Sequence, residues 1–100
     1  MEYRYLELEI IRWAEARKII PNSTPQAQYL KAVSEMGELA DAINKKDMAA
    51  IKDAVGDTLV CLINMCALLD IDMIECLKGA YEEIKDRKGT LLPSGVFVKE

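Results

Sequence analysis

The segment KDAVGDTLVCLINMCALL, residues 52–69, constrains the fold more than any other part of the chain. From Leu59 to Leu69 it is apolar on every side of a helix, except at Asn64. Such a helix must be covered all round, and the run is too short for a bilayer span of about 20 residues. A chain of 100 residues has few other helices to provide that cover. We therefore expect it to oligomerise, as a homodimer or homotetramer.

Two helices are predicted before this segment. Leu6, Ile10 and Trp13 or Ala14 recur at helical spacing, which predicts a helix over about 4–19. Ser23 and Gln26 form a capping box, and Pro25 suits a first turn. These signals predict a second helix over about 24–45. Its apolar stripe consists of Leu30, Val33, Met36, Ala40 and Ile43.

The third and fourth helices have start signals of their own. Asp47 is a cap for a helix over about 47–70, and Asp72 with Glu75 forms a capping box for one over about 73–87. The loops between the last three helices are short, so these helices should be antiparallel neighbours. Residues 89–100 form a tail with a β-prone VFV. We predict a single all-α domain, a four-helix antiparallel bundle that completes its core by oligomerisation.

The composition excludes several classes of site. The chain has no His, so His-based triads and HExxH zinc sites are ruled out. Its net charge of −4 argues against DNA or RNA as a partner. The charged N-terminus is no signal peptide, and no membrane partner is expected. The three Cys lack CxxC spacing and lie in apolar sequence, which indicates buried free thiols in a reducing cytoplasm.

Two sets of acids fall on neighbouring helices. Asp53, Asp57 and Asn64 lie within an arc of about 40° on the third helix. Glu35 and Glu38 face the same way on the second helix. Each pair alone fits an ordinary solvated face, but on antiparallel neighbours they can present three or four carboxylates to one point. Without His, such a site suits a hard cation, Mg²⁺ or Mn²⁺.

A family resemblance extends over about residues 13–100 and is clearest in three segments. These are QYLKAVSEMGELADAI, IKDAVGDTLVCLINMCALLDID and the ending AYEEIKDRKG…SGVFVKE. They resemble the all-α NTP pyrophosphatases of the MazG type, especially the short single-domain members common in phages. The resemblance implies Mg²⁺-dependent hydrolysis of a nucleoside triphosphate to a monophosphate and pyrophosphate. It also implies a metal site of Glu-x-x-Glu and Glu-x-x-Asp on successive helices.

Matched by position, Glu35 and Glu38 are the first pair and Asp57 is the final Asp. The third expected acid falls on Ala54, which departs from the family pattern. Asp53, next to it, can replace this ligand directly or through water, or the site can hold less metal. We assign Glu38 as the general base and Asn64 as a residue that orients an acid.

The remaining candidate substrate contacts each have a structural alternative. Trp13 either stacks on a base or belongs to the core. Gln28 and Lys31 either line the pocket or lie on a solvated face. The resemblance makes the end of the fourth helix a phosphate-contacting region, but its cations also suit a helix C-terminus. These cations are Lys78, Lys85, Arg87 and Lys88.

Two alternatives to the enzyme remain open. One is a family relative that binds nucleotide but, with Ala54 at the ligand position, turns it over poorly. The other is a structural helical module that recruits a protein through its apolar tail.

Overall fold

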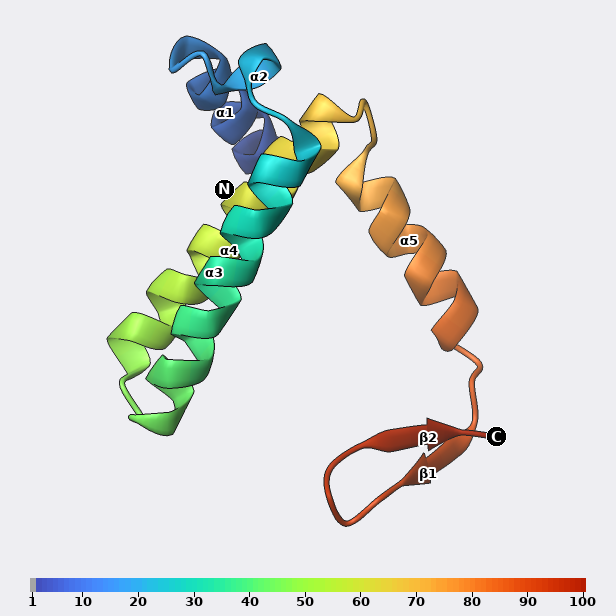
Figure 1. The fold of residues 1–100 in the computed structure, drawn as a ribbon. Coiled ribbons are helices and arrows are strands. Elements are labelled where there is room, and N and C mark those ends of the chain that lie inside the picture. Colours follow the sequence, from blue (N-terminus) through green and yellow to red (C-terminus); the bar gives the residue numbers. More distant parts are fainter. Residues whose placement is uncertain (1) are drawn as a thin grey trace.

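The computed structural model describes residues 2–100 and is built around one antiparallel helix pair. α3 (Pro25–Asn44) and α4 (Met48–Leu68) lie side by side along most of their length (Figure 1). Asp47 caps α4 as predicted, because its side chain accepts a hydrogen bond from the Ala50 N–H at 3.1 Å. The cap of α3 is Thr24, not Ser23. The Ser23 hydroxyl oxygen accepts from the Gln28 side chain instead.

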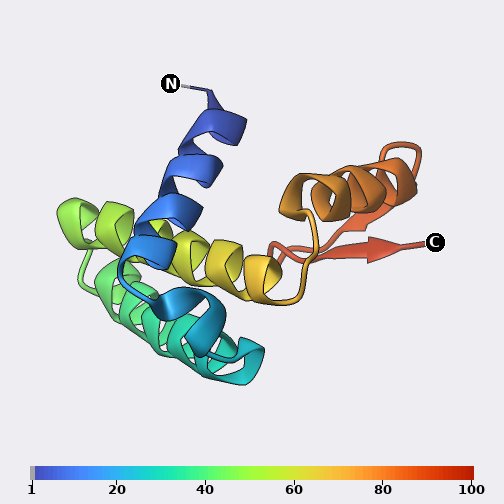
Figure 2. The same cartoon turned by 90° about the horizontal axis from the view of Figure 1, so that it is seen from above.

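α1 (Tyr3–Ala16) crosses α4 (Figure 2). It is followed in the chain by α2 (Ile19–Asn22), a single helical turn. The sequence predicted one helix to about residue 19. It ends earlier because Lys18 takes a left-handed backbone conformation, with φ 65°. The buried face of α1 also differs from the prediction. Glu7 is buried in place of Leu6, which is 44% exposed; of the two alternatives at the end of the stripe, Ala14 is buried and Trp13 is 46% exposed.

α5 (Met73–Ile84) points away from the α3–α4 pair (Figure 1). A small antiparallel hairpin at its far end pairs β1 (Gly89–Leu91) with β2 (Phe97–Lys99). The expected antiparallel packing of α5 against α4 is therefore wrong for the single chain. Asp70, in the connection, has a left-handed backbone with φ 57° that redirects the chain. No residue of α5 is buried.

The all-α prediction is confirmed, but the core of one chain is small. Its buried apolar side chains are Ala14, Ala32, Ala42, Ala54, Cys61 and Ile63. The stripe predicted as the core face of α3 points outward, with Leu30 exposed by 65% and Ile43 by 55%. The radius of gyration is 16.1 Å, against about 13 Å for a compact domain of this length. A single chain thus leaves much apolar surface uncovered.

The three cysteines are free thiols. Cys61 is buried and Cys66 is partly buried, but Cys76 is exposed, so the expectation of three buried thiols is wrong for Cys76. Burial raises the pKa of the Cys61 and Cys66 thiols. Over residues 2–100, no helix is both long enough and apolar enough to cross a membrane.

Candidate active site

Glu35 is a buried carboxylate on the face of α3 that packs on α4. It is only 6% exposed. One oxygen, Oε1, lies 3.3 Å from the ammonium nitrogen of Lys31. The other, Oε2, is buried and has no hydrogen-bond partner within the described part of the chain. A buried carboxylate oxygen without a partner is costly, so this atom is suited to accept a ligand.

Glu38, one turn later, is exposed but electrostatically linked to Glu35. Hydrogen bonding with Glu35, which needs a proton on one of the two carboxyl groups, is the main cause that raises the pKa of Glu38. Repulsion from the Glu35 charge and, more weakly, from Asp57 of α4 acts in the same direction. Three carboxylates from two helices therefore repel one another, and a bound cation would relieve that repulsion.

Asp57 also faces the groove between α1 and α4. One cavity there, of about 420 Å³, is lined by Asp53, Asp57, Gly56 and Val60 among other residues of α4, and by Glu7 with three apolar or aromatic residues of α1. A second cavity, of about 360 Å³, is lined by Asp57, Val60, Glu9, Ile10 and Trp13. Asp57 thus stands between the acids of α3 and a groove that ends at Trp13.

Ala54 and Asn64 lie on the buried side of α4. Ala54 is 4% exposed, and its carbonyl oxygen accepts a hydrogen bond from the Thr58 hydroxyl at 2.8 Å. Asn64 is 2% exposed, and its Oδ1 has no hydrogen-bond partner among the described residues. Asp53, in contrast, is exposed and lines the α1 side of α4. Its carboxylate therefore does not occupy the place that a side chain at Ala54 would take.

A divalent cation suits the donor types of this site. Among residues 2–100, no three His, Cys, Asp or Glu side chains already converge closely enough to hold a metal ion. The buried Glu35 Oε2, which has no partner in that range of the chain, can nevertheless act as an oxygen ligand. Glu38 and Asp57 are exposed, so their side chains can change rotamer to reach the same ion. Carboxylate oxygens without nitrogen or sulfur donors favour Mg²⁺ or Mn²⁺.

The predicted substrate contacts separate into two groups. Trp13, Gln28 and Lys31 lie on α1 and α3, with Trp13 in the cavity that Asp57 lines. The cations of α5 and its end lie apart from the acids of the same chain (Figure 1). Lys78 pairs with Glu75 at 3.7 Å and Lys85 with Glu82 at 2.7 Å. Arg87 and Lys88 line a separate cavity beside the hairpin.

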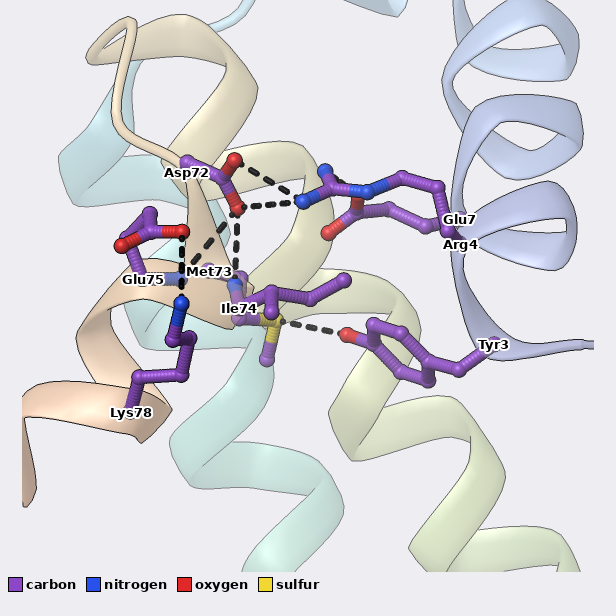
Figure 3. Close-up of polar contacts among 8 residues, drawn as sticks. All are labelled: Tyr3, Arg4, Glu7, Asp72, Met73, Ile74, Glu75 and Lys78. Carbon is purple, nitrogen blue, oxygen red and sulfur yellow. Dashed lines mark hydrogen bonds and ion pairs between the residues drawn. The ribbon is translucent and has the colours of Figure 1, made fainter. Parts of the chain in front are cut away.

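The sequence interpretation missed a charged cluster at the junction of α1, α4 and α5. Arg4 binds the buried Glu7 at 2.7 Å and also Asp72, the cap of α5 (Figure 3). The signal was present, because Glu7 and Ala14 are seven residues apart and share a helix face, and Arg4 precedes Glu7 by one turn. Glu9, which lines the Trp13 cavity, was also missed.

Fold and site together define an all-α domain with acidic side chains on an antiparallel helix pair. The profile of the family described as "MazG nucleotide pyrophosphohydrolase domain" matches residues 23–91. The chain belongs to this family, and the resemblance seen in its sequence is confirmed.

Two individual proteins are similar to the chain. One is an uncharacterized 18.2 kDa protein in the rep-hol intergenic region of Haemophilus phage HP1, 37% identical over 65 residues. The match covers 65% of this chain and 40% of that protein, so the chain spans well under half of its relative's length. The other is the structure of a cyanophage S-2L MazG-like pyrophosphohydrolase bound to dGDP and three catalytic Mn²⁺ ions per active site. It matches with a TM-score of 0.75 and 22% identity, over 100% of this chain and 94% of that one, which supports the shared fold.

Proposed function

We propose that the protein hydrolyses a nucleoside or deoxynucleoside triphosphate to its monophosphate and pyrophosphate, with Mg²⁺ or Mn²⁺ as cofactor. The observation that carries this proposal is Glu35, a buried carboxylate with an unpartnered oxygen beside Glu38. The family match supports the reaction. The Mn²⁺ ions and dGDP named for the cyanophage protein support the cofactor and the substrate class.

Glu35, Glu38 and Asp57 would hold the metal, and Asp53 would join them through a water molecule from its place one turn before Asp57. A divalent cation bound there supplies positive charge for the triphosphate oxygens. Glu38 is the proposed general base, since its raised pKa brings it closer to the pH at which a base both accepts and releases a proton. Lys31 orients Glu35 through their ion pair. Asn64 orients one of the acids from the buried side.

Self-association is part of the proposal. The exposed stripe of α3 and the unburied α5 give each chain two apolar faces that a second copy can cover. In a homodimer or homotetramer, α5 of one chain can lie over the acids of another. Lys85, Arg87 and Lys88, which follow directly on α5, would then contact phosphate oxygens in trans. Within the single chain, α5 points away from α3 and α4 (Figure 1).

Ala54 favours a second candidate function. A site with one acid fewer than the family pattern expects can bind nucleotide while turning it over slowly. We also propose a reducing cytoplasmic setting, which the three free thiols support, and no role in binding DNA or RNA, in line with the net charge of −4.

Release of pyrophosphate from a panel of nucleoside triphosphates with Mg²⁺ tests the activity. Turnover that chelation of the metal abolishes, and that Glu35→Gln also abolishes, supports the enzyme. If nucleotide raises the melting temperature but is not turned over, the protein binds nucleotide without acting as an enzyme. If nucleotide causes neither turnover nor stabilisation, both functions are wrong.

A further inference from the structure

The cavity between Trp13 and Asp57 has a carboxylate at its edge that the proposed metal site does not use. Glu9 lines this cavity together with Ile10, Trp13, Asp57 and Val60. Its volume of about 360 Å³ lies within the range of small-molecule sites. Two apolar side chains, one aromatic ring and two carboxylates line the cavity, which suits a planar polar ligand.

Trp13 is placed to stack on such a ligand. It is 46% exposed, although it lies on the helix that packs across α4. The guanidinium carbon of Arg17 lies 5.6 Å from the centre of its ring. Arg17 does not line the cavity. An indole held in this way offers a surface for any nucleobase, since every base has a flat π-face.

Glu9 supplies the feature that distinguishes one base from another. The Arg12 guanidinium donates to its Oε1 at 2.8 Å, which holds the side chain in place. An ionised carboxylate has about four acceptor positions and no donor, so acceptor positions remain on both oxygens. Its best partner is a base edge with two adjacent N–H donors.

Guanine alone among the common bases has that edge, made by N1–H and the N2 amino group. Adenine and cytosine present one donor beside one acceptor, and the acceptor would face a carboxylate oxygen. Uracil and thymine present one donor between two acceptors. The geometry points to guanine nucleotides as the preferred substrates, with Glu9 as the specificity-determining residue and Trp13 as the stacking surface. This inference rests on the proposed function, because Asp57 lines the same cavity and would set the phosphate end.

The test compares kcat/KM for GTP, ATP, CTP and UTP. Wild type should favour GTP by about tenfold or more, in keeping with one two-point base contact. Glu9→Gln should move the preference from GTP toward ATP, because a glutamine amide offers one acceptor and one donor, as the adenine edge requires. Glu15→Gln, the same charge change on the exposed part of α1, should keep the wild-type ratio. Trp13→Ala should weaken all four substrates alike.

Equal kcat/KM for the four nucleotides in wild type would overturn the inference and leave the proposed function intact. So would a GTP to ATP ratio that Glu9→Gln does not change. If wild type turns over no nucleotide, the proposed function fails, and binding of GMP and AMP is measured by calorimetry on the same variants. A preference for GMP that Glu9→Gln removes supports the guanine site even then, and equal binding overturns it.

Discussion

One guanidinium nitrogen of Arg4 reaches both carboxylate oxygens of Asp72, at 3.2 and 2.9 Å. Asp72 Oδ1 also accepts the Ile74 N–H at 2.9 Å and so caps α5 (Figure 3). A single carboxylate therefore anchors the first turn of α5 and ties it to α1. Glu7, buried beside Arg4, holds the guanidinium from the other side at 2.7 Å. This junction sets the direction in which α5 leaves the helix pair.

The junction should make stability depend on acid. The hydrogen bond from Arg4 is the main cause that keeps the pKa of Asp72 below its ordinary value. A carboxyl group whose pKa is lower when folded contributes stability above its unfolded pKa and loses it as the pH falls through the folded pKa. Melting temperature should thus drop on acidification below about pH 5. Arg4→Met should lack part of this drop.

Arg12→Met is the matched control, since it removes the same charge from the same helix without touching Asp72. Thermal melts of the three proteins from neutral pH downward give the answer. If Arg4→Met and wild type show parallel pH profiles, the pair with Asp72 does not stabilise the fold.

Asn64→Leu should stabilise the protein. The Asn64 side chain is 2% exposed and its Oδ1 has no partner in the described part of the chain. An apolar side chain of similar shape removes the desolvation penalty of that atom, about 1–3 kcal/mol. Chemical denaturation at constant protein concentration measures the gain. A loss of stability would mean that Asn64 has a partner in the assembled protein, across an interface.

Sequence patterns located the helices well because caps and breaks are local. Asp47 and Asp72 act as caps within a few residues of themselves, and both predictions hold. The direction of α5 was not predictable, because it depends on Asp70 in a left-handed conformation and on Arg4, far away in the sequence. The stripe through Leu30 and Ile43 was correctly read as apolar, but periodicity does not say which molecule covers it.

The acids show the same division. Helical spacing placed Glu35 and Glu38 on one face, and the structure links them electrostatically with Asp57. Helical spacing also put Asp53 on the same side of the helix as Asp57. It did not predict that Asp53 lies in the groove under α1. Glu7 and Glu9 were missed because hydrophobic spacing pointed to Leu6, Ile10 and Trp13 or Ala14 as the inner face.

The two aspartates of α4 should differ in their effect on turnover. Asp57→Asn removes a proposed metal ligand and should lower kcat at least about 100-fold, whereas Asp53→Asn, acting through water, should cost about tenfold. Steady-state pyrophosphate release at saturating nucleotide and metal measures both. Asp41→Asn, on α3 outside the proposed site, serves as the control. Equal losses for Asp53→Asn and Asp57→Asn would make Asp53 a direct ligand.

Ala54→Glu restores the acid that the family pattern expects, but at a buried place. Because Ala54 is 4% exposed, an added carboxylate should destabilise the metal-free protein by several kcal/mol. Mn²⁺ or Mg²⁺ should recover more stability in this variant than in wild type, whereas Ala54→Gln, which adds no carboxylate, should gain no more from metal than wild type does. Melting with and without metal checks this. An equal metal effect in all three proteins would place position 54 outside the site.

Light scattering should give at least twice the chain mass of 11.2 kDa. Leu30→Glu should produce monomers, since Leu30 is 65% exposed in the single chain and lies on the stripe that a second copy would cover. Gln26→Glu, at the exposed start of α3, adds the same charge and should leave the mass unchanged. A wild-type monomer whose melting temperature is independent of concentration contradicts the assembly.

The three-residue connection between α3 and α4 has a consequence for how the chain folds. Contacts between these helices join residues close in sequence, and such local topologies form in microseconds to milliseconds. Beyond its first turn, which Arg4 ties to α1, the α5 segment and its hairpin have no fully buried residue in the single chain, so they have little to fold against until two chains meet. Folding should therefore divide into a fast step whose rate is independent of concentration and a slower second-order step that orders α5. Newly made protein would pass through a helical-hairpin intermediate, and the rate at which it meets a second copy of the chain would set the lifetime of that intermediate.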